Sequence, residues 1–252
     1  FPALSTVTIV NGLNLVAAVL PGRPLISVRL HLACGARSEP AGYEGIATLL
    51  AALLVEGNGH GGGQPFADRL ELMGATLSGS ASWDGLTLAL SVPADHLPAA
   101  LDLLADAVLT PELDPVALVR LREEQLAWIA GESADPGTRA VAAFQAALSG
   151  ADARFAVPLS GTTDALASCA DHTLRSFLET ARSSPATLVV VGSFDLHDVA
   201  AHVAALFGGW HVTTTDLPKV PRRVLGSRQL ILVDRPGSVQ THLLLGHALP
   251  PR

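Results

Sequence analysis

The 252-residue sequence contains only two cysteines, one methionine and one tyrosine, and only 15% of its residues are Asp, Glu, Lys or Arg. Two cysteines are too few for a disulfide framework. Cys34 and Cys169 each lie in an apolar stretch, so we predict buried free thiols, and this favours a cytoplasmic location. A removed leader is the alternative for a chain that begins at Phe1 without a methionine.

Long hydrophobic runs and basic clusters are also missing. The longest uncharged apolar run, Ile46 to Val55, is about half of a membrane span. The net charge is -7, which argues against nucleic acid and anionic membrane as partners. The sequence has no Gly-x-Ser-x-Gly, phosphate loop or Cys-x-x-Cys motif, and the glycine-rich stretch at 57–63 is predicted to be a flexible turn.

Apolar residues make up 49% of the chain and follow both strand and helix periodicities, which indicates a globular domain. Alternation and turn residues, including Asn11-Gly12, predict strands at 6–10, 15–20, 25–33, 76–82 and 86–92. A short buried strand is predicted at 186–191. Helical spacing predicts helices at 44–56, 65–73, 98–109, 115–131, 138–148, 171–181 and 196–207. This mixture, without a strict βαβ rhythm, predicts an α+β fold with a largely antiparallel sheet.

A change in composition predicts a domain boundary near the C-terminal end. Residues 1–212 are expected to form the first domain, and 213–227, with two prolines and several basic residues, a linker. Two further strands are predicted at 229–233 and 241–246. Two strands cannot bury a core alone, so 228–252 is expected to be the truncated beginning of a second domain.

Several motifs occur in a shared order. They are Gly35-Ala36-Arg37-Ser38-Glu39, Gly45-Ile46-Ala47-Thr48, Gly74-Ala75 followed by Ser80, Ser82 and Asp84, Pro158-Leu159-Ser160-Gly161-Thr162, Val190-Val191-Gly192-Ser193-Phe194-Asp195, Phe207-Gly208-Gly209-Trp210, and Asp234 to Gln240 followed by Gly246-His247. With the Asn-Gly hairpin, this order resembles the M16 (insulinase/pitrilysin) peptidases along nearly the whole chain. The resemblance implies an M16 (LuxS/MPP-like) domain, a mostly antiparallel sheet flanked by helices, followed by the start of a second similar domain.

M16 peptidases carry His-x-x-Glu-His on a helix, where two imidazoles from adjacent turns bind zinc and the glutamate serves as general base. In this sequence the matching histidine positions are Thr48 and Ala52, and Ala51 replaces the base. The family's third ligand, a glutamate on a later helix, aligns with Trp128, 76 residues after Ala52. The resemblance therefore predicts no catalytic residue and no metal in this chain.

Other candidate ligands are weak. Glu123, Glu124 and Glu132 lie close enough to the third position for a shift of one helical turn to restore a carboxylate, but not the imidazoles. His60 follows a helix on the glycine loop, and His197 and His202 are separated by five positions, a poor ligand spacing on a helix.

Some M16 peptidases are heterodimers of one zinc-bearing chain and one chain without the motif. This chain resembles the non-catalytic subunit type of that M16B group. The resemblance implies a partner that bears His-x-x-Glu-His and supplies the zinc, and a peptide substrate enclosed by both chains. The alternatives are a structural scaffold subunit and a stand-alone peptide-binding protein. The helix around 46–55 is expected to be a core helix rather than a binding groove, with Trp128 filling the space left by the lost ligands.

Overall fold

The computed structural model describes residues 3–9, 12–57, 64–150, 153–213 and 229–247. Its strands form one sheet from β1 (Ser5–Thr8), β2 (Asn14–Val19), β3 (Leu25–Leu32), β4 (Thr76–Ala81), β5 (Leu86–Pro93) and β6 (Ala186–Gly192). The order across the sheet is β1-β2-β6-β3-β5-β4. All neighbours are antiparallel except β2 and β6, which are parallel. The predicted α+β fold with a largely antiparallel sheet is therefore confirmed.

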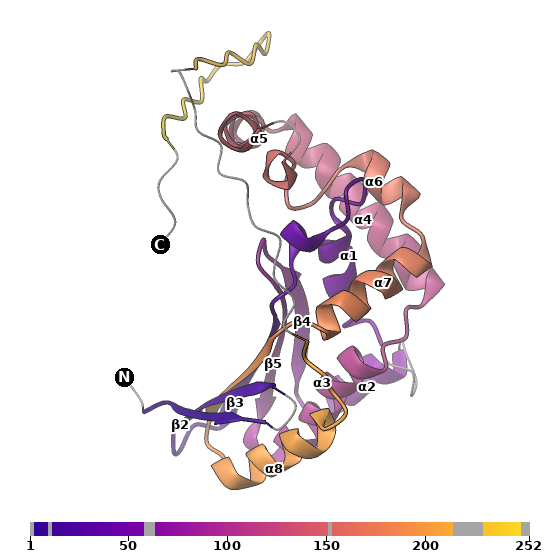
Figure 1. Cartoon of the computed structure of the whole chain (residues 1–252), viewed down its shortest axis with the longest axis vertical. Coiled ribbons are helices and arrows are strands. Elements are labelled where there is room, and N and C mark those ends of the chain that lie inside the picture. Colours follow the sequence, from indigo (N-terminus) through magenta and orange to yellow (C-terminus); the bar gives the residue numbers. More distant parts are fainter. Residues whose placement is uncertain (1–2, 10–11, 58–63, 151–152, 214–228, 248–252) are drawn as a thin grey trace.

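The helices gather on one face of this sheet (Figure 1). They are α1 (Ile46–Leu53), α2 (Gln64–Leu72), α3 (Leu97–Leu109), α4 (Pro115–Ala134), α5 (Pro136–Ser149), α6 (Thr163–Ser168), α7 (Asp171–Arg182) and α8 (Leu196–Phe207). In β3, Ile26, Val28 and Leu30 are buried beneath the helices, whereas Ser27 and Arg29 are exposed. Because side chains alternate along a strand, the exposed residues mark the sheet face that the helices leave open.

The helix boundaries follow capping residues. The Asp114 carboxylate accepts from the amides of Val116 and Ala117 at the start of α4, and Asp135 caps α5 in the same way. Helix α6 is not among the predicted helices; it is short, and the Thr162 hydroxyl caps it by accepting from the Ala165 amide. None of the described helices has both the length and the apolar composition needed to cross a membrane.

Cys34 and Cys169 are both free and buried, as predicted. Burial raises the pKa of the Cys34 thiol to about 11, and burial also raises the pKa of Cys169. Both side chains therefore behave as apolar core residues at neutral pH.

The last described segment differs from the prediction. Neither 229–233 nor 241–246 forms a strand, because no described strand pairs with them. The segment instead lies beside α5, where Gly246 contacts Phe144 and the Arg235 guanidinium donates to the Ala134 carbonyl at 2.6 Å. Most of the predicted linker at 213–227 lies outside the described residues.

Candidate functional site

Helix α1 carries the three motif positions and lies between the sheet and α4. Ala51 is buried, and Thr48 and Ala52 are half-buried. The side chains at these positions contain one polar atom, the Thr48 hydroxyl, which donates to the Leu159 carbonyl at 3.3 Å. Zinc sites need imidazole, thiolate or carboxylate ligands, so these residues do not fit the metal that the His-x-x-Glu-His motif holds. The expectation of a core helix is confirmed, because most of α1 is buried.

Trp128 does not fill the space beside α1, and that prediction is wrong. Its side chain is 66% exposed. Gln125, almost one helical turn earlier, is buried against α1 instead. Its amide nitrogen lies 2.7 Å from the Ser160 carbonyl and 3.0 Å from the Gly45 carbonyl. Leu118, Leu121 and Gln125 are buried along α4. Trp128 continues their helical spacing but is exposed, because the residues of α4 after Gln125 are no longer buried.

The candidate carboxylates on α4 lie apart from one another. Glu123 and Glu124 are exposed, and Glu124 pairs with Arg120 at 2.8 Å. Glu132 is half-buried, and its carboxylate accepts a hydrogen bond from the Ser160 hydroxyl. Only Glu132 therefore faces the turn that covers the start of α1, and its carboxylate is already engaged there.

Glu39 is the buried acid of the site. Its side chain is fully buried and accepts from the amides of Ala47 at 2.8 Å and Gly45 at 3.1 Å, at the N-terminus of α1. The Arg154 guanidinium donates to the same carboxylate at 2.5 Å. Burial raises the pKa of the Glu39 carboxyl, and Arg154 and the two amides offset part of that rise. A sequence motif, Gly-Ala-Arg-Ser-Glu, thus ends in the residue that anchors the motif helix.

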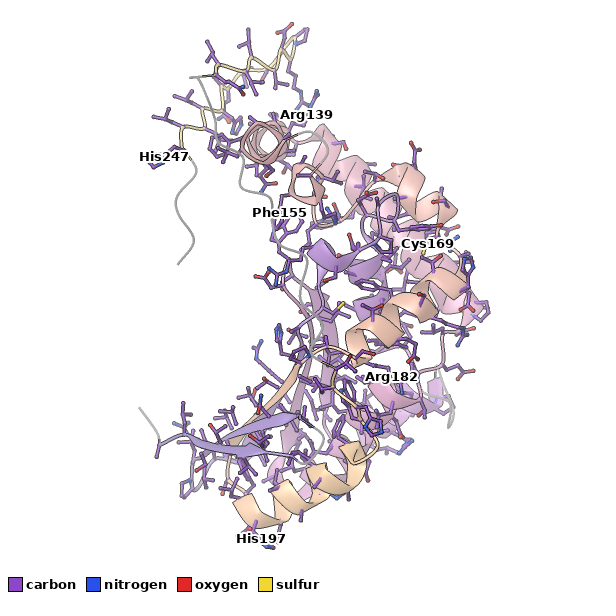
Figure 2. All side chains as sticks on the ribbon, viewed as in Figure 1. Arg139, Phe155, Cys169, Arg182, His197 and His247 are labelled. Atoms are coloured by element: carbon purple, nitrogen blue, oxygen red, sulfur yellow. The ribbon has the colours of Figure 1, made fainter. Side chains whose placement is uncertain are left out.

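Arg154 belongs to a short 3-10 helix, η3 (Arg154–Ala156), and connects Glu39 to the following turn. It donates to the carbonyls of Val157 and Pro158, each at 3.0 Å, and lies 5.1 Å from the centre of the Trp83 ring. Trp83 in turn stacks on Phe155, with 4.6 Å between ring centres. Figure 2 shows Phe155 between α5 and α1. These contacts fix the turn at 157–161 on the start of α1.

Two glycines form the closest contact between the start of α1 and the turn at 157–161. Gly45 has φ +102° and Gly161 has φ +89°. A side-chain carbon at Gly161 would lie 2.0 Å from the Glu44 carbonyl oxygen, and one at Gly45 would lie 2.4 Å from the Ser160 carbonyl oxygen. The two backbones therefore touch directly, and both positions require glycine for space and for conformation.

A cavity of about 300 Å³ adjoins the same turn, between α4, α5 and residues 158–163. Its wall combines apolar side chains with one acid, one arginine and several hydroxyls. The lining residues are Ile129, Glu132, Ser133, Thr138, Arg139, Ala142, Pro158, Ser160, Gly161, Thr162 and Thr163. This size is at the lower limit of small-molecule sites.

The histidines considered as alternative ligands do not converge. His202 Nε2 lies 2.8 Å from an Asp102 oxygen on α3, whereas His197 is 93% exposed at the outer end of α8 (Figure 2). His60 lies outside the described residues. Among the residues that the structure describes, Asp195, His197 and Asp198 are grouped closely enough to bind a cation, but all three are exposed and Asp195 already caps α8.

Replacing Gln125 with glutamate is expected to lower the free energy of unfolding by about 2–4 kcal/mol. The change removes both donated hydrogen bonds and places an anion against the carbonyls of Gly45 and Ser160. Chemical denaturation measures the loss, which should shrink at acidic pH, where the introduced carboxyl can donate one bond. The control Glu123→Gln, exposed on the same helix, should stay within about 0.5 kcal/mol of the original chain. Equal stability of the two variants would contradict the Gln125 contacts.

Comparisons with known proteins agree with this fold. Residues 16–149 match the family model described as insulinase (peptidase family M16). A protein of Mycobacterium tuberculosis named an uncharacterized zinc protease is 30% identical over 251 residues, which cover 97% of this chain and 56% of that protein. A protein of the same name from Mycobacterium leprae is 29% identical over 252 residues. The chain therefore spans just over half the length of these relatives.

Solved structures share the fold at lower identity. The peptidase M16 inactive domain from Pseudomonas fluorescens superimposes with a TM-score of 0.78 at 20% identity, covering 87% of this chain and 54% of that one. Pitrilysin gives a TM-score of 0.75 at 20% identity and covers 88% of this chain, but 24% of its own. At this level of identity the likeness is one of fold.

Proposed function

Because this chain belongs to peptidase family M16, the insulinase family, we propose that it is a non-catalytic subunit of a heterodimeric M16 zinc metallopeptidase. In this proposal it encloses the peptide substrate and supports a partner that carries His-x-x-Glu-His and the zinc. The observation that carries the proposal is the chemistry of α1, where Thr48, Ala51 and Ala52 offer neither metal ligands nor a general base.

The surroundings of α1 support a structural role for this helix. Gln125 and Glu39 both face its start. The Gln125 amide nitrogen donates to two backbone carbonyls, and the Glu39 carboxylate accepts from two backbone amides and from Arg154. Buried polar groups with several hydrogen bonds rigidify a site. The name of the Pseudomonas fluorescens structure, an inactive M16 domain, also supports the existence of M16 domains without activity.

The edge of the sheet supports a role in holding peptides. Strand β4 packs against α1 and pairs with β5, and no other described strand pairs with it. Thr76, Ser78 and Ser80 are exposed along it. An unpaired edge can accept an extended peptide as an added strand, which then derives affinity from main-chain hydrogen bonds. In the proposed complex this edge forms part of the wall around the substrate.

The experiment combines metal analysis with peptidase assays on this chain, on an M16 chain with an intact motif from the same genome, and on their mixture. We expect substoichiometric zinc and no cleavage from this chain alone. Added to its partner, it should raise kcat/KM at least about tenfold, equivalent to about 1.4 kcal/mol of transition-state stabilisation. A partner whose motif glutamate is replaced by glutamine provides the control, and its mixture should be inactive.

Three outcomes would reject the proposal. Stoichiometric zinc with cleavage by this chain alone would show that α1 or another site is catalytic. A stable complex without any rise in turnover would favour the scaffold alternative, and peptide binding without complex formation would favour the stand-alone peptide-binding protein.

A further inference from the structure

The sheet carries almost no charge. None of its six strands contains Asp or Glu, and their single Arg or Lys is Arg29 on β3. The whole chain, in contrast, has a net charge of -7. The acidic residues therefore lie outside the strands, and the sheet contributes a cation to an otherwise acidic protein.

Arg29 is exposed and alternates along β3 with the buried residues beneath the helices, so it lies on the open face of the sheet. Its cross-strand neighbours are Val189 on β6 and Ala89 on β5, and Ser78 on β4 follows Ala89 in the same row. None of these side chains can neutralise a guanidinium. Among the described residues no ion pair or hydrogen bond to the Arg29 side chain is formed. Its donors are available to a ligand.

The next row on this face supplies further hydrogen-bonding groups. His31 lies between Thr187 on β6 and Thr87 on β5, and Ser80 follows Thr87 in the register. The His31 Nδ1 atom lies 3.1 Å from the Thr87 hydroxyl, which holds the ring in place. The open face thus combines a free guanidinium with an imidazole and a row of hydroxyls, and its strands offer no group that would attract a cation.

We propose that this open face, defined by Arg29, His31, Thr87 and Thr187, selects peptide segments with carboxylate side chains. The inference rests on the proposed function, because it names the class of peptide that the chain holds. Arginine binds carboxylates with paired, charge-assisted hydrogen bonds. A peptide rich in lysine or arginine would find no counter-ion on the strands and would be repelled by Arg29.

The spacing between strands restricts which segment of a bound peptide can contact Arg29. A peptide added to the edge of β4 would lie three strands from β3, about 14 Å away at about 4.8 Å per strand. That distance exceeds the Debye length of about 8 Å at physiological salt. The carboxylate must therefore come from a segment that crosses the open face, rather than from the segment paired with β4.

Fluorescence anisotropy with the full 252-residue chain tests the inference. Three labelled peptides of one sequence would differ only at two central positions, occupied by glutamate, glutamine or lysine. At physiological salt the glutamate peptide should bind about three- to fivefold more tightly than the glutamine peptide, and the lysine peptide most weakly. Arg29→Gln should remove the preference for glutamate, and Arg29→Glu should reverse it.

The matched control is Arg175→Gln, which changes the net charge equally but lies on α7, in the helical layer. It should keep the preference of the original chain. Equal binding of all three peptides would overturn this inference while leaving the proposed function in place, and binding of none would count against both. A dimer that Arg29→Glu dissociates, seen by sedimentation, would overturn it in favour of a second copy on this face.

Discussion

Replacing Arg154 with glutamine is expected to lower the free energy of unfolding by about 3–5 kcal/mol, the usual cost of leaving a buried charge without its partner. Arg154 is 11% exposed and its partner Glu39 is fully buried. The variant also loses the bonds that Arg154 donates to Val157 and Pro158. Urea denaturation followed by circular dichroism measures the change.

The loss should grow with pH. Burial already raises the pKa of Glu39, and without Arg154 the pKa should rise further. A carboxyl with a raised pKa binds its proton more tightly in the folded state than in the unfolded state. Its contribution to stability is complete below the unfolded pKa and is lost as the pH rises through the folded pKa. Arg154→Gln should therefore cost less at about pH 5 than at about pH 8.

A double-mutant cycle separates the ion pair from the other contacts of Arg154. The double variant Glu39→Gln with Arg154→Gln removes both charges, so it should recover part of the stability that Arg154→Gln alone loses. Arg175→Gln, which breaks an exposed pair with Asp171, should cost less than about 1 kcal/mol. A loss for Arg154→Gln no larger than this control would show that the pair does not hold α1 to the turn.

Replacing Gly161 with alanine is expected to cost about 3–5 kcal/mol, from backbone strain and overpacking together. The residue has φ +89°, and the new carbon would lie 2.0 Å from the Glu44 carbonyl oxygen and 2.6 Å from the Gly45 Cα. Both obstacles are backbone atoms, so the turn at 157–161 must move away from α1. Because Gln125 and Thr48 bond to this turn, their contacts should weaken as well.

Gly22→Ala is the matched control, because Gly22 has a similar φ of +79° but no atom within 4 Å of the added carbon. It should cost about 1–2 kcal/mol, the strain alone. Thermal unfolding compares the two variants. If they lose equal stability, the close approach of the two glycines is not a constraint, and the turn is not fixed on α1 as described. If Gly161→Ala, but not Gly22→Ala, no longer raises kcat/KM of the zinc-bearing partner, the contact between α1 and the turn at 157–161 is linked to the proposed function.

The sequence alone determined much of the fold. Alternation in 25–33 and 86–92 led to β3 and β5, because period-two patterns reflect a sheet with one buried face, and a short apolar run at 186–191 led to β6. Helical periodicity located seven of the helices within a few residues, and the order of short motifs led to the M16 family. The assignment of residues 48, 51 and 52 to the positions of the zinc motif stays a prediction, which rests on the resemblance of the preceding Gly-Ala-Arg-Ser-Glu motif.

Only the tertiary structure decided which residues meet at the site. The count of 76 residues from Ala52 predicted that Trp128 would fill the space beside α1, whereas Gln125 is the α4 side chain buried there. A residue count cannot account for small differences in the length of the segment that connects two helices. The partners Glu39 and Arg154 are separated by 115 positions, and no local pattern connects them. The parallel pairing of β6 with β2 is equally non-local. Periodicity reports which face of an element is buried, whereas the partner on that face is set by the packing of distant segments.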